Sequence, residues 1–191
     1  MASPAIFAPP QTPMVQPPPS IGACWRDFSP EIIVHCTQGV QWKIEANWPA
    51  VYAELEKRLI ASPEIQAGAI GTMAIETART FEPVREAYWL SEEWRANNLR
   101  YYPYYGRGYI QLTWDYNYTN YGSIIGQPLY NQPDLALEPD IAAAVFAEFF
   151  GQSGAAAAAA RCDWAECRRR VQGADAGLSE LIAICTCLGY P

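Results

Sequence analysis

The sequence predicts a mainly α-helical protein with a small amount of irregular β structure beside a cleft. Apolar residues recur at helical spacing through most of the chain after residue 47. Residues 81–109 are the exception, because they are rich in aromatic residues, proline and asparagine and show no long period. A chain of 191 residues is long enough for one domain with a sizeable core and an appendage.

The N-terminal part of the chain differs in composition from the rest. Residues 1–22 are proline-rich and uncharged, which predicts a tail or linker. Residues 23–46 contain two cysteines and one short apolar run, and we expect them to form an irregular extension that packs on the main domain. The main domain is then expected to span residues 47–191.

Two helices are predicted at the start of the main domain. Asn47 is a suitable N-cap with a proline close behind it, and the following apolar residues lie on one helical face as far as residue 60. Ser62 begins a second helix by the same logic, and its apolar residues recur at helical spacing to about Arg79. This second helix carries Glu76 near its C-terminal end.

Most of the second half is also predicted to be helical. Residues 81–109 are expected to form loops and a short hairpin, whereas N-cap residues such as Asp140 and Asp163 mark later helix starts. The predicted elements are a helix over 114–125, a loop over 128–139, helices over 141–150 and 155–160, a helix over 163–171 and a last helix over 177–188.

Charge and hydropathy exclude several classes of function. The formal net charge is −7 and the pI is about 4.7, which argues against a nucleic-acid-binding protein. The sequence has no run of about 18 apolar residues, so we expect no membrane insertion. The arginine run 168–170 is a local basic exception, which we interpret as a solvated helix face or, alternatively, a contact to an acidic polymer.

The N-terminus lacks the features of a secretory signal. Residues 1–22 contain no basic region and no continuous apolar stretch. We therefore expect a protein that is made in a host cytoplasm without a signal peptide. If it acts outside that compartment, another factor must release it.

Six cysteines raise the question of metal ligands or disulfides. Their spacing does not match a zinc site, and the sole histidine, His35, lies beside one cysteine only, so we expect no metal. An even number of cysteines makes disulfides possible, although free buried thiols are an alternative for Cys185 and Cys187, which we do not expect to pair with each other. The pairings to test first are Cys24 with Cys36 and Cys162 with Cys167.

The stretch YGRGYIQLTW, residues 105–114, combines two glycines around an arginine with an apolar/polar alternation. Glycines let the backbone turn sharply or approach another group closely. The alternation places Gln111 and Thr113 on one face and Ile110 and Leu112 on the other. One face would anchor in the core, and the other would offer an amide and a hydroxyl to a ligand.

Two glutamates are candidates for acid–base chemistry. Glu76 has apolar sequence neighbours, and partial burial would keep its proton available for transfer to a glycosidic oxygen. Glu86 lies ten residues further on in an irregular segment, with Glu82 as a competitor. A pair of carboxylates about 6.5–9.5 Å apart would admit a water and invert the anomeric centre, with the loop carboxylate as the base.

The segments IETARTFEPVREAYW and YYGRGYIQLTWDYNYTNYG resemble glycoside hydrolase family 19, and more closely its branch in bacteriophage endolysins. The segment DWAECRRRVQGADAGLSEL is similar to the C-terminal helices of that group. The resemblance covers roughly residues 47–190. It implies a lysozyme-like, two-lobed helical domain with the cleft between the lobes.

The same resemblance implies roles for single residues. Glu76 matches the general acid, Glu86 the general base, and Thr113 the hydroxyl that positions the water. No cofactor is expected. The residues expected to bind substrate or to brace the cleft are Gln111, Asn117, Arg107, Tyr105 and Tyr109.

The sequence departs from the family pattern in three places. Ile75 replaces a histidine that commonly precedes the catalytic glutamate, and residues 78–80 (Ala-Arg-Thr) replace glycines that commonly follow it. Gln172 precedes Gly173 where the family has Asn-Gly. Neither candidate carboxylate is lost.

Three functions are compatible with these observations. The first is a peptidoglycan hydrolase that cleaves the β-1,4 amino-sugar backbone, as a phage endolysin or a virion-associated lysin that could contact virion proteins through its N-terminal tail. The second is a chitinase acting on poly-N-acetylglucosamine. The third is a non-catalytic virion or glycan-binding protein that retains the fold.

Overall fold

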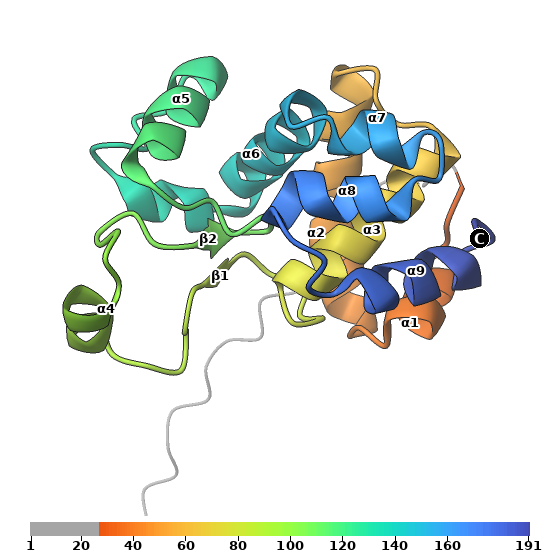
Figure 1. Ribbon diagram of the computed structural model, residues 1–191, viewed down its shortest axis with the longest axis horizontal. Coiled ribbons are helices and arrows are strands. Elements are labelled where there is room, and N and C mark those ends of the chain that lie inside the picture. The colour runs from red at the N-terminus through yellow and green to blue at the C-terminus, as the bar shows by residue number, and fades with distance from the viewer. Residues whose placement is uncertain (1–26) are drawn as a thin grey trace, which may run out of the picture.

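The computed structural model describes residues 27–191, which form a mainly helical fold with one small sheet (Figure 1). The predicted fold class is therefore confirmed. The predicted tail, residues 1–22, lies outside the described residues. The elements are α1 Pro30–Thr37, α2 Gln41–Lys57, α3 Pro63–Glu76, β1 Val84–Arg85, α4 Glu92–Asn98, β2 Arg107–Gly108, α5 Asp115–Ile125, the 3-10 helix η1 Pro133–Leu137, α6 Pro139–Gln152, α7 Ala155–Ala159, α8 Trp164–Gln172 and α9 Leu178–Cys187.

Helix α3 lies at the centre of the larger group of helices and packs against α1, α7, α8 and α9. Every residue from Ile65 to Ala74 is buried, because neighbours cover this helix on all sides. Two glycines allow the close packing: a Cβ on Gly71 would lie 2.6 Å from Leu181, and one on Gly68 would lie 2.9 Å from Ala159. The tightly packed helix ends at Glu76 and so fixes the position of that residue.

Helix α2 packs along α6 and starts earlier than predicted. Its N-cap is Val40, and Asn47 lies inside the helix. The Asn47 side chain donates to the Lys43 carbonyl at 2.9 Å and accepts the Tyr109 hydroxyl at 2.7 Å. Tertiary contacts therefore account for a buried asparagine that resembles a cap in sequence, and the expected division at residue 47 falls within a continuous helix.

The extension over residues 23–46 is not irregular where the structure describes it. Ser29 caps α1 by accepting the Ile32 N–H at 3.4 Å, and Ile33 is fully buried. Cys36 of α1 forms a disulfide with Cys187 of α9. This segment is thus an integral part of the helical core rather than an appendage.

The disulfide overturns both of the pairings expected first. Cys36 is bonded to Cys187, so it is not available to Cys24, which itself lies outside the described residues. Cys162 and Cys167 are free thiols. The expectation that Cys185 and Cys187 do not pair is confirmed, and Cys185 is buried and free. Distance along the chain misled the prediction, because the true partners are 151 residues apart.

The sheet is an antiparallel hairpin of β1 and β2, with Val84 opposite Gly108 and Arg85 opposite Arg107. Figure 1 shows the hairpin between the larger helical group and a smaller part that contains α4 and α5. The sequence predicted a short hairpin but not α4. Ser91 caps that helix by accepting the Trp94 N–H at 3.1 Å, a signal hidden in the aromatic-rich segment.

The C-terminal helices agree with the prediction except at the start of α6. Helix α6 has Glu138 as its N-cap, so Asp140 lies in the first turn. Helix α7 is separate from α6 because Gly154 between them has φ 85°, a left-handed conformation. Asp163 caps α8 as predicted by accepting the Glu166 N–H at 3.0 Å.

Candidate functional site

Glu76 ends α3 against a buried arginine. Its Oε1 atom lies 2.5 Å from Nη1 of Arg168, whose side chain is only 2% exposed, whereas that of Glu76 is 12% exposed. Arg168 comes from α8, so the contact joins residues that are far apart in the chain. The expected surroundings of Glu76 are therefore corrected: the carboxylate lies beside a guanidinium, not in a purely apolar wall.

All three guanidinium nitrogens of Arg168 donate hydrogen bonds. Arg168 donates from Nε to the Ala176 carbonyl at 2.6 Å and from Nη2 to Oε1 of Gln172 at 2.7 Å. Gln172 is one of the departures from the family pattern, and here it fixes the cation that binds Glu76. The arginine run is thus not uniformly solvated, because Arg169 and Arg170 pair with Glu166 at the surface while Arg168 points inward.

The turn after α3 has a left-handed backbone at two residues that are not glycine. Ala78 and Arg79 have φ of 50° and 65°, in the left-handed region that glycine adopts at no steric cost. Arg79 forms an ion pair with Glu180 at 2.7 Å and donates to Gln38 at 3.0 Å. Tertiary bonds from α9 and the end of α1 thereby hold a turn for which the family commonly uses glycine.

Glu86 follows β1 directly and is bonded to the segment before β2. Its N–H donates to the Gly106 carbonyl at 2.7 Å, and its Oε2 accepts the Gly106 N–H at 3.0 Å. Its Oε1 accepts the Tyr101 hydroxyl at 2.6 Å. Partial burial and this hydrogen bond raise the pKa of Tyr101 to about 12. The competitor Glu82 pairs with Lys43 at 2.5 Å.

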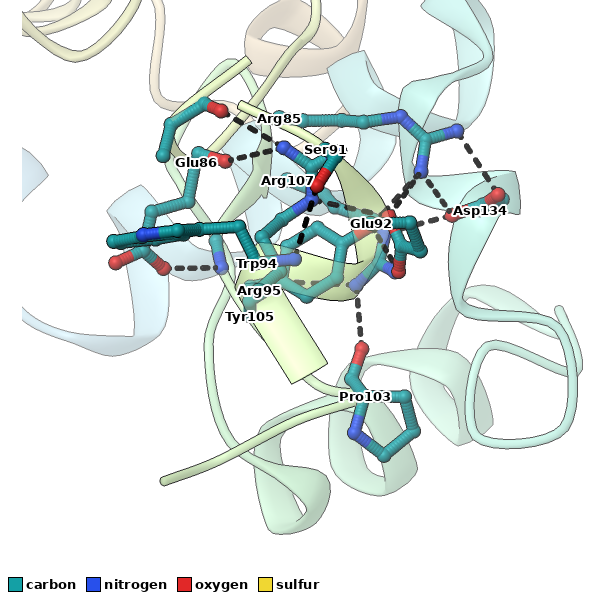
Figure 2. Close-up of polar contacts among 12 residues, drawn as sticks. Arg85, Glu86, Ser91, Glu92, Trp94, Arg95, Pro103, Tyr105, Arg107 and Asp134 are labelled. Atoms are coloured by element: carbon teal, nitrogen blue, oxygen red, sulfur yellow. Dashed lines mark hydrogen bonds and ion pairs between the residues drawn. The ribbon is translucent and has the colours of Figure 1, made fainter. Parts of the chain in front are cut away.

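The Arg107 side chain is enclosed by hydrogen-bond partners from its own segment and from η1 (Figure 2). Its side chain is 2% exposed and donates to Asp134 at 2.8 Å, to the Pro103 carbonyl at 2.9 Å and to the Tyr118 hydroxyl at 3.0 Å. The guanidinium also lies 3.6 Å from the centre of the Tyr105 ring. The predicted bracing role fits this geometry, and a direct substrate contact does not.

Both glycines around Arg107 lie in close contact with neighbouring groups. A Cβ on Gly106 would lie 2.7 Å from Oε1 of Gln111. Gly108 has φ 81°, and a Cβ there would lie 2.7 Å from the Ala136 carbonyl. The proposed reason for these glycines, a sharp turn and a close approach, is the one the structure gives.

Gln111, Thr113 and Asn117 each donate to backbone carbonyls. The Gln111 amide donates to the Val84 and Gly108 carbonyls at 3.0 and 3.2 Å. Thr113 donates to the Gln111 carbonyl at 2.8 Å, and Asn117 donates to the Thr113 carbonyl at 2.8 Å. All three are partly exposed, while Ile110 and Leu112 are buried, as the alternation predicted.

Tyr105 and Tyr109 differ from their expected role. Both side chains are fully buried. Tyr109 donates to Asn47 at 2.7 Å, and Tyr105 donates to Glu92 at 3.0 Å. Their hydroxyls therefore tie the motif to the rest of the protein and are not available to a bound substrate.

A charged network, drawn in Figure 2, includes several residues that line a shallow hollow. Arg85 donates to both carboxyl oxygens of Asp134, at 3.1 and 3.0 Å. Burial alone would raise the pKa of Asp134, but hydrogen bonds and charges from Arg85 and Arg107 outweigh it and lower that pKa. The hollow is lined by Arg85, Glu92, Tyr102, Pro103, Arg107, Gln132, Pro133 and Asp134.

Neither a metal cluster nor a membrane helix occurs in the described part of the chain. Within residues 27–191, no group of three or more His, Cys, Asp or Glu side chains is arranged to hold a metal ion. Over the same range no helix is both long and apolar enough to cross a bilayer.

Sequence reasoning missed two site residues. Arg168 is hidden in a run of three arginines, and only the helical spacing of Trp164 and Cys167 on the buried face of α8 could have singled it out. Tyr101 lies in an aromatic-rich segment with no periodic signal. Arg168 contacts a residue 92 positions away and Tyr101 one 15 positions away, so neither contact shows in a local sequence pattern.

Comparison with family models gives one match, to the glycoside hydrolase 19 model described as chitinase class I, over residues 74–175. The matched region contains both candidate carboxylates, the YGRGYIQLTW stretch and Arg168.

Short segments of plant proteins are also similar. The chain is 52% identical over 40 residues to an endochitinase of Arabidopsis thaliana, covering 20% of this chain and 14% of that protein. It is 56% identical over 39 residues to endochitinase 1 of Theobroma cacao, covering 20% and 12%. It is 59% identical over 32 residues to inactive chitinase-like protein 1 of Hevea brasiliensis, covering 17% and 10%. The chain thus spans only a small part of these relatives.

Solved structures agree over most of the fold. Chitinase C from Streptomyces griseus HUT6037 superposes with a TM-score of 0.62 at 19% identity, covering 88% of this chain and 79% of that one. A mutant of chitinase C gives a TM-score of 0.67 at 17% identity, covering 86% and 93%. A bacterial family 19 chitinase gives 0.64 at 18% identity, covering 85% and 95%. These likenesses confirm the expected lysozyme-like fold.

Proposed function

This chain belongs to glycoside hydrolase family 19, whose model is described as chitinase class I. We propose that it hydrolyses the β-1,4 amino-sugar backbone of peptidoglycan. The observation that carries this proposal is the fixed carboxylate of Glu76 at the end of α3. Arg168 binds its Oε1 atom, and within the described residues Oε2 has no hydrogen-bond partner. A carboxyl oriented in this way can present the proton on Oε2 to a glycosidic oxygen.

Glu86 and Thr113 supply the second half of the reaction in this proposal. Glu86 accepts a water proton, and its orientation is set by the Gly106 N–H and the Tyr101 hydroxyl. Thr113 donates to the Gln111 carbonyl, which leaves its hydroxyl oxygen able to accept from that water. Attack from the face opposite the leaving group would invert the anomeric centre. The Glu76 anion formed by proton transfer stays beside the Arg168 guanidinium.

Two other functions have specific support. Chitin hydrolysis is favoured by the names of the similar proteins, several of which are endochitinases. A non-catalytic role is favoured by the similarity to the inactive chitinase-like protein of Hevea brasiliensis. The resemblance of the motif segments to endolysins favours peptidoglycan as the substrate.

The site of action belongs to the same proposal. A phage lysin would reach the cell wall after release from its host or as part of the virion. The Cys36–Cys187 disulfide is compatible with an oxidising environment of this kind. Contacts of the N-terminal tail with virion proteins stay a prediction, because that tail lies outside the described residues.

The test compares purified peptidoglycan with chitin as substrates and analyses the products by mass spectrometry. We expect soluble muropeptides from peptidoglycan and a loss of more than about 100-fold in rate for Glu76→Gln, because the variant retains the shape but not the proton. Glu64→Gln at the other end of α3 is the matched control. Release from chitin alone would favour the chitinase, and peptidoglycan binding without cleavage would favour the non-catalytic role.

A further inference from the structure

Arg100 is exposed and stands out among the basic residues of an acidic chain. Over residues 27–191, every lysine and arginine contacts a carboxylate except Arg100 and Arg161. Arg161 donates to the Ala157 carbonyl at 2.6 Å. Arg100 forms neither a hydrogen bond nor an ion pair within that range, and its guanidinium lies 5.0 Å from the centre of the Trp114 ring.

The position of Arg100 links it to the candidate site. The Trp114 ring meets the Tyr101 ring edge-on, with centres 5.0 Å apart, and the Tyr101 hydroxyl binds Glu86. Trp114 also directly follows Thr113 in the chain. Arg100 is therefore linked to Glu86, the candidate base, through the rings of Trp114 and Tyr101.

Beside the cation lies an aromatic surface. The rings of Trp114 and Tyr116 are nearly parallel, with an angle of 17° and centres 6.4 Å apart, and Tyr116 is 62% exposed. Trp114 has φ 78°, an unfavourable conformation for a bulky residue, and its N–H is fixed by the Tyr104 carbonyl at 2.8 Å. Such strain persists where the surrounding structure holds a side chain in a required place.

We propose that Arg100 binds the carboxylates carried by the peptide substituents of peptidoglycan, while Trp114 and Tyr116 pack against the adjacent sugar. A guanidinium forms paired hydrogen bonds with a carboxylate. The unsubstituted chain of chitin has no carboxylate to offer. Arg100 is then a specificity-determining residue for the charged glycan, an inference that rests on the proposed function.

The experiment compares native peptidoglycan with peptidoglycan whose carboxyl groups have been converted to amides. For Arg100→Gln we expect the ratio of kcat/KM on native over amidated substrate to fall about fivefold, as the loss of one partly exposed ion pair predicts. The change should lie mainly in KM. Arg100→Lys retains the charge but not the paired hydrogen bonds, so it should recover only part of the ratio. Arg161→Gln removes the same charge elsewhere and should keep the wild-type ratio.

Binding separates this inference from the proposed function. Co-sedimentation with the two substrates in a Glu76→Gln background measures the same ratio without hydrolysis. Wild-type protein that cleaves neither substrate would refute the proposed function, and the sedimentation ratio would still test Arg100. The inference is overturned if Arg100→Gln keeps the wild-type ratio, or if Arg161→Gln lowers it as much.

Discussion

The two candidate catalytic carboxylates are fixed in opposite ways. Glu76 is bound by a buried cation from a helix near the other end of the chain. Glu86 is bound by neutral donors, the Gly106 N–H and the Tyr101 hydroxyl, which lie within the same hairpin and its connection. The Glu76 region therefore depends on the packing of α3 against α8, whereas the carboxylate of Glu86 is held by the segment that connects β1 to β2.

The largest expected effect is on the Glu76 side. Arg168→Met should lower the free energy of unfolding by about 3–5 kcal/mol, because it leaves a nearly buried carboxylate without its partner. Urea unfolding followed by circular dichroism measures the change. Adding Glu76→Gln to this variant should recover part of the loss, since the unpaired charge is then gone. Equal stabilities for the wild type and the single variant would contradict the ion-pair argument.

A smaller effect is expected from crowding the hairpin. Gly106→Ala places a methyl group 2.7 Å from Oε1 of Gln111 and should cost about 1–3 kcal/mol in unfolding free energy. Activity should also fall, because the Gly106 N–H that orients Glu86 shifts with the turn. The matched comparison introduces Gly106→Ala into a Gln111→Ala background. There the glycine substitution should cost less unfolding free energy than it does in the wild type, because the contacted side chain is gone. A purely additive double variant would show that the contact does not limit the turn.

The smallest effect concerns the neutral donor to Glu86. Tyr101→Phe removes one hydrogen bond and should cost about 1 kcal/mol near neutral pH. In the wild type, the raised Tyr101 pKa of about 12 means that its contribution is complete below the unfolded value near 10 and is lost as pH rises towards 12.

Urea unfolding at several values between pH 8 and 11 tests this sign. Stability of the wild type should fall with rising pH, and the fall should be shallower in Tyr101→Phe. Tyr104→Phe is a useful comparison, because its pKa is also raised to about 12 although its hydroxyl does not bind Glu86. A Tyr101→Phe profile parallel to that of the wild type would refute the assignment.

The same contrast explains what the sequence could predict. Helices α3, α5, α8 and α9 were predicted close to their observed bounds, because caps, glycines and helical spacing are local signals. The hairpin and the glycines of residues 105–114 were also accessible from local pattern. These features position Glu86, Gln111 and Thr113, so the local half of the site was largely predictable.

The half of the site around Glu76 could not be predicted from local sequence, for a physical reason. The contact between Glu76 and Arg168 joins residues 92 apart, and the disulfide joins residues 151 apart. Neither pairing has a periodic or compositional signature. Asn47 misled the prediction of the α2 start in the same way, since its side chain accepts a hydrogen bond from Tyr109 and does not cap a helix.

The bond between Cys36 and Cys187 has a consequence for proteolysis. It joins the first and last helices of the described chain, so most of the described protein forms a covalent ring. A protease that cuts one exposed loop inside the ring opens it but does not separate it into two pieces. A singly nicked molecule therefore migrates as one polypeptide without reductant and as two fragments after reduction. After one such cut, both candidate carboxylates stay in one covalently joined molecule.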